Sequence, residues 1–474
     1  MEHRLGMATL GEFARRVHGT VVLPADDGYD AARGVWNAAH DRRPELVVRC
    51  SGVGDVIETV AFARSEGLPL AVRGGGHSVA GFSTCDGGVV LDTGPMNGVQ
   101  VDPTRSRVLV QGGCVWRDVD VATQQFGLAV TGGLVSSTGV AGFTLGGGIG
   151  WLVRRAGLAA DNLLAADLVT ADGSTLHASP HEHPDLFWAL TGGGGNFGVV
   201  TSFEFGLHDI GTLVHAGMVL YPIEETAQIV CGYGRASTGA HDALTTVLKV
   251  TTVPENASIP PSLWGRRVLA MVGCWSGDPS GATAETAAFR SLGTVLLDTF
   301  ADRDYVAWQQ ALDGSFPRGQ HHYFRGVFLS ALGEAEAQVL VEAAATLPHP
   351  LTEVVIHQLG GAVSRVAPAS TAFAVRDATH IVNVIARTPT AQGFAGVRTW
   401  AREVTKALNP GGATYVNFTG EQAASLVRRS YPDHTYRRLV EVKDRYDPCN
   451  VFRLNQNVEP STYLEPSRAT LHHT

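Results

Sequence analysis

The sequence predicts an α+β fold of two domains, in which the second domain interrupts the first. A chain of 474 residues with 44% hydrophobic and 17% charged residues suffices for one very large or two ordinary domains. Residues 43–207 alternate short strand-like runs with glycine-rich turns, whereas residues 212–413 contain longer helical patterns between isolated strands. Short glycine- and asparagine-marked pieces return after residue 413. We therefore expect a discontinuous first domain, 1–208 and 414–474, and an inserted domain, 209–413, built as an antiparallel sheet backed by helices.

Short elements account for residues 43–207. Ser51–Glu66 is expected to be a capped helix, because Val56, Ile57, Val60 and Ala63 share one face. Pro184 opens a shorter helix that reaches Leu190, and Ala171–Gly173 is typical of a hairpin turn. The strands expected here are Leu68–Arg73, Gly88–Asp92, Arg107–Gln111, Asp167–Thr170, Thr175–Ser179 and Val199–Phe205.

Longer elements are predicted in residues 212–413. The expected helices are Glu334–Ala345 and Thr390–Leu408. The expected strands are Thr245–Thr252, Arg267–Cys274, Tyr323–Ala331 and Glu353–Leu359. The tail from Pro460 is expected to be mobile.

Composition excludes several classes of protein. The net charge of −9, without a Lys/Arg-rich run, disfavours nucleic-acid binding. None of the six cysteines forms a C-x-x-C pair, so neither a zinc ribbon nor a disulfide framework is indicated. The sequence shows no signal-peptide core and no run of 18 apolar residues, so we expect no membrane span and a cytoplasmic location.

Glycine is the outlier of the composition, with 56 residues, and it clusters in three segments. The segments are Ala71–Gly81, Ser136–Gly150 and Thr191–Val200. Gly74–Gly76 directly follow a strand, so consecutive backbone N–H groups can form an anion-binding nest with His77 at its rim. A dinucleotide-binding βαβ unit is a weaker interpretation, because Gly146–Gly150 lacks the strand–turn–helix context and the ribose-binding acid.

Two other motifs suggest competing chemistry. Gly76–Ala80 is a near miss to the nucleophile elbow of a hydrolase, with Ser78 as nucleophile, but no helical pattern follows it. His181-Glu182-His183 suggests a metal site, but the segment offers only two histidines in a loop before a helix. We expect these side chains to be solvated and predict no metal site.

The motifs together resemble a known family, the FAD-linked oxidases of the vanillyl-alcohol-oxidase (p-cresol-methylhydroxylase) type. The matching segments are Arg73–Gly81, Gly139–Gly150, Gly157–Asn162, Pro184–Trp188 and Gly193–Gly198. The ending Tyr446–Asn457 resembles the C-terminal signature of the berberine-bridge-enzyme-like branch. The resemblance runs from about Ala25 to Asn457 and is closest to bacterial members from specialised metabolism and nicotine breakdown.

The resemblance implies a two-domain vanillyl-alcohol-oxidase-type fold, whose first domain binds FAD and whose inserted domain binds substrate. It implies that the pyrophosphate lies against Gly74–Ser78 and that His77 bonds covalently to the 8α carbon of the flavin. Many members add a cysteinyl link to C6, but Val135 occupies that position here, and Cys114 belongs to another segment. We therefore predict a single covalent link. The residues expected to bind FAD are Arg73, Gly74, Gly75, Gly76, His77, Ser78, Gly81, Thr138, Gly139, Gly142, Gly146, Gly148, Gly150, Asn162, Gly198, Val199, Val200, Asn455 and Asn457.

The proton acceptor is harder to assign. In many members the base is a tyrosine of a Tyr-x-Asn-Tyr run, but the matching run here is Tyr415-Val416-Asn417-Phe418. Tyr415 remains, but strand alternation would put it on the face opposite Phe418. On the inserted domain, the resemblance directs Val355 and His357 towards the flavin.

Other polar side chains are weighed beside His357. Lys249 occupies a comparable inward position, and either side chain could take a proton. His321, His322, Tyr323 and Arg325 lie on another candidate strand. Thr138 could donate a hydrogen bond to flavin N5. For each of these a purely structural role is the competing interpretation.

The expected activity is the two-electron oxidation of an alcohol, amine or activated C–H in a small aromatic or natural-product-like substrate. Oxygen is the expected acceptor and yields hydrogen peroxide. A flavin-bearing cyclase without net oxidation and a carbohydrate oxidase remain as alternatives. The sequence leaves the oligomeric state open.

Overall fold

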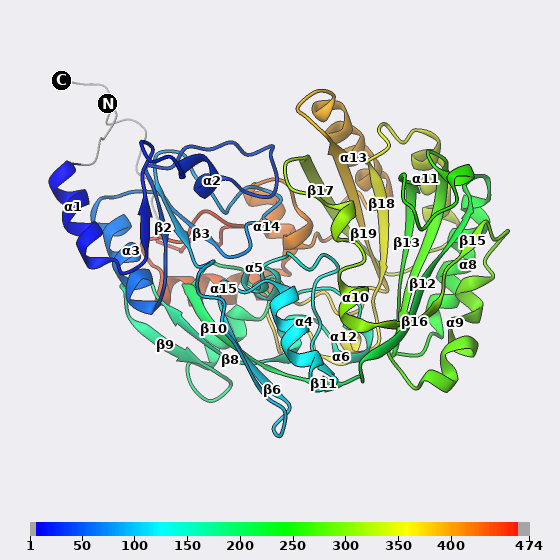
Figure 1. Cartoon of the computed structure of the whole chain (residues 1–474), viewed down its shortest axis with the longest axis horizontal. Coiled ribbons are helices and arrows are strands. Elements are labelled where there is room, and N and C mark those ends of the chain that lie inside the picture. Colours follow the sequence, from blue (N-terminus) through cyan, green and yellow to red (C-terminus); the bar gives the residue numbers. More distant parts are fainter. Residues whose placement is uncertain (1–5, 463–474) are drawn as a thin grey trace.

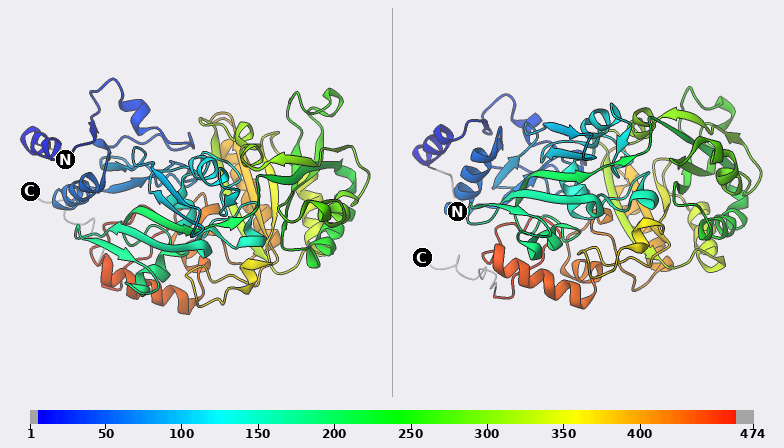
Figure 2. Two further views of the ribbon diagram at one scale, coloured as in Figure 1. Left: turned by 60° about the horizontal axis from the view of Figure 1, so that its bottom comes forward. Right: turned by 90° about the horizontal axis from the view of Figure 1, so that it is seen from below.

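The computed structural model describes residues 6–462 and contains three main β-sheets (Figure 1). Two smaller sheets belong to the glycine-rich part of the chain, and one eight-stranded sheet is built from residues between Leu213 and Thr388. The C-terminal segment returns beside the second sheet (Figure 2).

The first sheet has the strand order β1-β2-β4-β3, with β4 parallel to both of its neighbours. All four residues of β4 are buried because strands lie on both of its sides. Helix α3 covers this sheet, and Val56 and Val60 lie in its core. The elements are β1 Thr20–Val22, β2 Leu46–Arg49, β3 Leu70–Arg73, β4 Val89–Asp92, α1 Met7–Arg16, α2 Tyr29–Arg33 and α3 Val53–Ser65.

The second sheet is antiparallel in the order β5-β6-β10-β8-β9. Its core includes Trp116, Phe203 and Phe205, with helices α4, α7 and α15 packed around it. A small two-stranded sheet, β7–β11, lies beside it. The strands are β5 Val99–Asp102, β6 Arg107–Gln111, β7 Leu128–Ala129, β8 Leu163–Val169, β9 Thr175–Ala178, β10 Val199–Gly206 and β11 His208–Asp209. The helices are α4 Trp116–Gln124, α5 Val140–Leu145, α6 Val153–Ala156 and α7 Pro184–Leu190.

The third sheet has the order β15-β12-β14-β13-β18-β19-β17, with β16 also paired to β12. Helices α8, α9, α11 and α13 bury one face of it in a core that includes Tyr233, Leu248 and Ile356. The strands are β12 Leu213–Pro222, β13 Leu244–Thr252, β14 Arg267–Trp275, β15 Leu297–Asp298, β16 Ala301–Asp304, β17 His321–Leu329, β18 Glu353–Gln358 and β19 His380–Thr388. The helices are α8 Thr226–Thr238, α9 Ala282–Arg290, α10 Tyr305–Gln309, α11 Glu334–Ala345, α12 Ala362–Arg365 and α13 Phe394–Leu408.

The C-terminal return contributes helices α14 Ala424–Ser430 and α15 Asp433–Tyr446. The Lys443 ammonium of α15 is fully buried and donates to the Asn196 carbonyl, the Phe452 carbonyl and the Asp447 carboxylate, at 2.8, 3.0 and 2.7 Å. Asp447 in turn accepts the backbone N–H groups of Val451 and Phe452. The C-terminal signature is thereby fixed to the third glycine-rich loop.

Most predicted elements are confirmed, some of them with shifted ends. Helices 184–190 and 334–345 and strand 107–111 match to the residue, whereas the strand expected at 323–331 begins at residue 321 and the helix expected at 390–408 begins at residue 394. The strand conformation assumed for Tyr415–Phe418 is wrong, because Val416–Phe418 form a 3₁₀ turn that brings the two aromatic rings within 4.9 Å.

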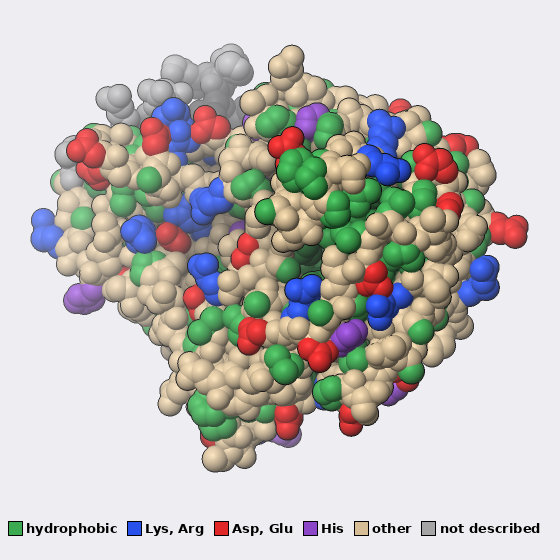
Figure 3. All heavy atoms as spheres, turned by 45° about the vertical axis from the view of Figure 1, so that its right-hand side comes forward, with side chains coloured by type: hydrophobic (Ala, Val, Ile, Leu, Met, Phe, Trp, Pro, Cys, Tyr) green, Lys and Arg blue, Asp and Glu red, His purple; other side chains and the backbone are tan. Residues whose placement is uncertain are grey.

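Charges of both signs are interspersed over the face in Figure 3, without a stripe of one sign there. No helix among residues 6–462 combines the length and the apolar composition that crossing a membrane requires.

Candidate active site

A cavity of about 380 Å³ lies between the glycine-rich loops and the inner face of the third sheet. Its lining joins segments that are hundreds of residues apart, from Trp36 to Gln456. The predicted site residues that line it are Gly74, Gly75, Gly76, His77, Ser78, Thr138, Gly139, Gly142, Gly198, Val200, Lys249, His357 and Asn455.

The first two glycine-rich loops touch at Gly75 and Gly139. A Cβ atom on Gly75 would lie 2.4 Å from the Gly139 nitrogen, and a Cβ on Gly139 would lie equally close to the Gly75 nitrogen. Only residues without a side chain allow the two backbones this approach. The backbone N–H groups of Gly75 through Ser78 donate no hydrogen bond to any residue in 6–462. Four unpaired donors in sequence at a cavity wall fit an anion such as a pyrophosphate.

Predicted residues outside the lining support the loops from behind. Arg73 donates to Asp92 over 2.9 Å, and Asn162 donates to two carbonyls in its own turn. Gly148 donates its N–H to the Tyr415 hydroxyl over 2.7 Å. The predicted residues that do not line the cavity are Arg73, Gly81, Gly146, Gly148, Gly150, Asn162, Val199, Tyr415 and Asn457.

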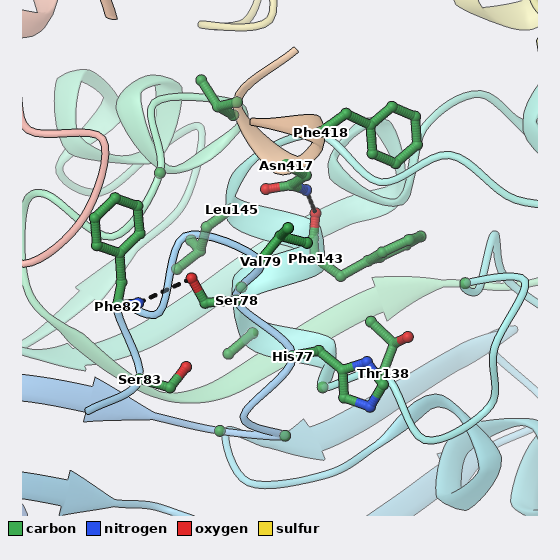
Figure 4. Close-up of a pocket in the computed structure, with 18 of the residues that line it drawn as sticks. His77, Ser78, Val79, Phe82, Ser83, Thr138, Phe143, Leu145, Asn417 and Phe418 are labelled. Carbon is green, nitrogen blue, oxygen red and sulfur yellow. Dashed lines mark hydrogen bonds between the residues drawn. The ribbon is translucent and has the colours of Figure 1, made fainter. Parts of the chain in front are cut away.

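The lining also fits the remaining parts of FAD. The side-chain oxygens of Asn455 and Gln456 are buried at the cavity without a hydrogen-bond partner among the described residues. Unpaired buried amides require a ligand or water partner. Apolar side chains such as Val72, Phe82 and Leu145 complete this part of the wall and suit a flat aromatic ring system (Figure 4).

His77 is held in an aromatic stack beside Thr138 (Figure 4). The Trp36 ring lies between the imidazoles of His77 and His322, with centroid distances of 4.9 and 3.8 Å. His77 Nε2 lies 3.0 Å from the Ser137 hydroxyl, and Nδ1 makes no hydrogen bond within residues 6–462. Burial lowers the pKa of His77 to about 4, helped by the charge of Arg318. The ring is therefore neutral at pH 7, and no described residue engages Nδ1.

The inner face of the third sheet forms the opposite wall. Lys249 on β13 and Asn383 on β19 both pair with Val355 on β18, so the three side chains project from the same face. His357 follows two residues along β18 and lies 5.4 Å from the Phe418 ring. The apolar side chains around them are Val247, Val272, Phe324 and Ile385.

The geometry gives different properties to the four candidate catalytic residues, which are Tyr415, His357, Thr138 and Lys249. Tyr415 is buried, its hydroxyl accepts hydrogen bonds from Gly148 and Asn417, and burial raises its pKa. Burial lowers the pKa of His357 to about 3, with a contribution from Lys249. At pH 7, protonating His357 therefore costs roughly 5 kcal/mol, which makes it a weak acceptor.

Thr138 and Lys249 both face the cavity. The Thr138 hydroxyl makes no hydrogen bond within residues 6–462, so it is free for a ligand. Lys249 Nζ lies 2.5 Å from a Glu353 carboxylate oxygen. In this ion pair Lys249 is an ammonium, which has no lone pair to accept a proton.

Three residues of the site escaped the sequence analysis. Asn383 lies on β19, a strand that was missed although a lone asparagine inside the apolar run Ile381–Ile385 was a usable signal. Trp36 stands in a loop without a motif, and its stacking on His77 could not be inferred from the sequence. Glu353 begins the strand predicted at 353–359, but its ion pairs with Lys249 and Arg387 depend on strand order.

The competing motifs find no support in their surroundings. No helix forms between Gly74 and Gly88, and the Ser78 hydroxyl accepts the Phe82 N–H, so the elbow of a hydrolase is not built. Among residues 6–462 no three histidine, cysteine or acidic side chains are grouped as metal ligands. The Cys114 thiol is buried against the Gly98 carbonyl and lies outside the lining.

The buried His322 gives a prediction for pH-dependent stability. Neither ring nitrogen has a partner among the described residues, and burial lowers the pKa to about 3. Between pH 7 and pH 5 the His322 imidazole takes up a proton in the unfolded chain but stays neutral in the folded protein. The folded state therefore loses stability as the pH falls through 6.5, by about 2 kcal/mol for this residue.

Replacing His322 by phenylalanine should remove this contribution. Urea denaturation at pH 7 and pH 5 measures the difference, which should shrink by about 2 kcal/mol in His322→Phe. His181→Phe, in an exposed loop, is the control and should keep the wild-type difference. An unchanged difference in His322→Phe would show that the imidazole is already protonated in the folded protein.

Known protein families match the glycine-rich part and the C-terminal return of this chain. Residues 44–179 match the FAD binding domain family, and residues 414–459 match the berberine and berberine-like family. (R)-6-hydroxynicotine oxidase of Paenarthrobacter nicotinovorans is 34% identical over 460 residues, which cover 94% of this chain and 97% of that protein.

Solved structures agree with these matches. The crystal structure of 6-hydroxy-D-nicotine oxidase from Arthrobacter nicotinovorans superposes with a TM-score of 0.84 at 32% identity, covering 94% of this chain and 98% of the other. Berberine bridge enzyme from Eschscholzia californica shares the fold with a TM-score of 0.83 at 20% identity, covering 96% of this chain and all of the other, 100%. The vanillyl-alcohol-oxidase-type fold expected from the sequence is confirmed. The chain thus belongs to the berberine-bridge-enzyme-like branch of the FAD-linked oxidases and is an FAD-dependent oxidoreductase.

Proposed function

We propose that this oxidoreductase removes two electrons from an alcohol, amine or activated C–H of a small aromatic, natural-product-like substrate and passes them to oxygen, giving hydrogen peroxide. The observation that carries the proposal is that one cavity is shared by the nest with His77 and by the inner face of the third sheet. FAD, when bound, supplies the two-electron acceptor.

Different residues of the cavity would hold different parts of FAD. The free N–H groups of Gly75–Ser78 would hold the pyrophosphate, and Asn455 and Gln456 would offer their amides to the polar edges of the cofactor. His77 would form the single covalent link, since its imidazole is neutral and Nδ1 is unengaged. Val135 lines the cavity where a second, cysteinyl link would need a thiol.

The substrate side of the cavity favours an aromatic molecule over a sugar. On the third sheet, the polar lining side chains are Lys249, His357 and Asn383, whereas the other lining side chains of that sheet are apolar. A sugar presents hydroxyl groups on most of its edges, and each would lose its water without a partner here. (R)-6-hydroxynicotine oxidase, by its name, acts on an aromatic compound, which supports the same substrate class. For the location we propose the cytoplasm, and for the biological setting specialised metabolism.

Covalent attachment is tested by denaturation followed by mass measurement. Wild type should keep the flavin mass, and proteolysis should give one flavin-bearing peptide that contains His77. His77→Ala should release its flavin completely, whereas His177→Ala, an exposed histidine paired with Asp167, should behave as wild type. Free flavin from denatured wild type would overturn the link and leave the oxidase proposal standing.

Oxygen consumption tests the reaction itself. A screen of aromatic alcohols, amines and phenols with an oxygen electrode should find substrates that consume oxygen in equal amount to the product formed. Product formation without oxygen uptake would instead identify a flavin-bearing cyclase.

A further inference from the structure

The charge on the described cavity wall is of one sign. Lys249 is the only lysine, arginine, aspartate or glutamate among the lining residues. The two lining histidines, His77 and His357, have pKa values of about 4 and 3 and are neutral at pH 7. The described wall therefore presents a cation and no anion to whatever binds there.

Glu353 does not cancel the charge of Lys249, because its carboxylate also pairs with Arg387. Its carboxylate is buried between Lys249 Nζ at 2.5 Å and an Arg387 guanidinium nitrogen at 2.9 Å. Burial alone would raise the pKa of Glu353, but the charges of Lys249 and Arg387 outweigh it and lower the pKa. Two cations around one carboxylate leave one net positive charge.

Arg387 does not line the cavity. It donates to the carbonyls of Leu351 and Ser315 and packs on the Phe316 ring at 4.4 Å. Lys249 forms an ion pair with Glu353 and no hydrogen bond with any residue in 6–462, and its side chain is 13% exposed. The excess charge is therefore presented by Lys249, with N–H donors left for a ligand.

Two neutral polar groups flank Lys249 without partners of their own. Oδ1 of Asn383 and Nε2 of His357 are buried and form no hydrogen bond with any described residue. Asn383 lies two strands from Lys249 across Val355, about 10 Å away at Cα, and both side chains project from the same face. A planar molecule lying over Val355 could contact both.

A buried net charge is stable only when an opposite charge or hydrogen-bonding groups compensate it. We propose that Lys249 is the anchor of the substrate and that it selects an aromatic compound carrying an anionic oxygen, either a phenolate or a carboxylate. Asn383 and His357 bind the neutral polar groups of the same molecule. The inference rests on the proposed function, narrows its substrate class and disfavours amines that are cationic at neutral pH. Lys249 is then a specificity determinant and not the proton acceptor.

Isothermal titration calorimetry of the flavin-loaded protein tests this without turnover. Four probes of similar size differ in charge: 4-nitrobenzoate, 4-nitrophenol, 4-nitrobenzyl alcohol and 4-nitrobenzylamine. We expect at least one anion to bind about tenfold or more tightly than the alcohol, and the amine to bind more weakly than the alcohol. Tighter binding of nitrobenzoate identifies a carboxylate, and nitrophenol binding that strengthens as the phenol ionises identifies a phenolate.

Variants test whether Lys249 causes the preference for anions. Lys249→Met should weaken anion binding at least tenfold and leave the affinity for the alcohol unchanged. Lys249→Arg should restore most of the anion affinity. Lys406 is an exposed lysine of α13, and Lys406→Met should match wild type. Lys249→Gln also leaves the neutral pair of Glu353 and Arg387 but keeps a polar group at the cavity, and it serves as a second variant if Lys249→Met alone unfolds.

Equal affinity for anion and alcohol in wild type, tightest binding of the amine, or undiminished anion affinity without Lys249 would each overturn the proposal. The flavin absorbance of each sample shows whether the cofactor is present. A failure of anion recognition is thereby separated from a failure of the proposed oxidation, which is read from oxygen uptake.

Discussion

Replacing Gly75 by alanine is expected to yield a folded protein that carries at least tenfold less FAD than wild type. The new Cβ would lie 2.4 Å from the Gly139 nitrogen and 2.6 Å from its Cα. Both are backbone atoms of a second loop, so no side-chain rotation relieves the overlap. Overpacking of this kind costs about 1–3 kcal/mol and forces backbone shifts. The loops must separate, and the four free N–H groups of Gly75–Ser78 lose their common direction.

The flavin-to-protein ratio after purification and the melting temperature measure the two consequences. Gly54→Ala in α3 is the control, because Gly54 does not line the cavity and a Cβ there would meet nothing within 4 Å. We expect wild-type flavin content in that variant. A Gly75→Ala protein with full flavin content would show that the contact between the two loops is not what shapes the phosphate site.

The contact between Gly75 and Gly139 also shows what the sequence could and could not predict. Each glycine run was recognisable because it directly follows a strand or precedes a short helix, and the motifs carry the family resemblance. That these two glycines touch across a separation of 64 residues has no local signature. It follows from the tertiary arrangement of the loops, which periodicity does not encode.

The resemblance directs Val355 and His357 towards the flavin, and both line the cavity, but it could not supply the electrostatics of this face. His357 and Lys249 do project into the cavity. Their properties come from neighbours on other strands: Glu353 fixes Lys249 as a cation, and burial keeps His357 neutral. The order β13-β18-β19 brings these groups together, and β19 was missed because its almost continuous apolar run lacks the alternation of a half-exposed strand.

The turn at Tyr415–Phe418 was misinterpreted for a related reason. Valine, tyrosine and phenylalanine favour strands, so local propensity predicts a strand for this segment. Asn417 instead donates its side-chain amide to the Phe143 carbonyl (Figure 4). The same amide donates to the Tyr415 hydroxyl. These contacts hold a 3₁₀ turn against the second glycine-rich segment. The tertiary partner of Asn417, and not local propensity, decides the conformation.

Replacing Lys443 by methionine is expected to destabilise the protein by about 3–5 kcal/mol, because it leaves the Asp447 carboxylate buried without its cation. Both side chains are completely inaccessible to solvent, and the ammonium also donates to two carbonyls, of Asn196 and Phe452. Those carbonyls tie α15 to the third glycine-rich loop and to the segment that carries Asn455 and Gln456 at the cavity. The loss should therefore appear twice, as a lower free energy of unfolding in urea and as weaker retention of FAD in a variant that also carries His77→Ala.

Arg445→Met is the matched control for Lys443→Met, since Arg445 lies two residues away on the same helix and forms an ion pair with Asp185 at 2.9 Å. The Arg445 side chain is 64% exposed, so its removal should cost less than about 1 kcal/mol. Adding Asp447→Asn to Lys443→Met removes the orphaned charge and keeps an acceptor oxygen for one of the two N–H groups, of Val451 or Phe452, so it should recover part of the stability. Equal effects of Lys443→Met and Arg445→Met would mean that water reaches Asp447 and that the C-terminal signature is held by its backbone contacts alone.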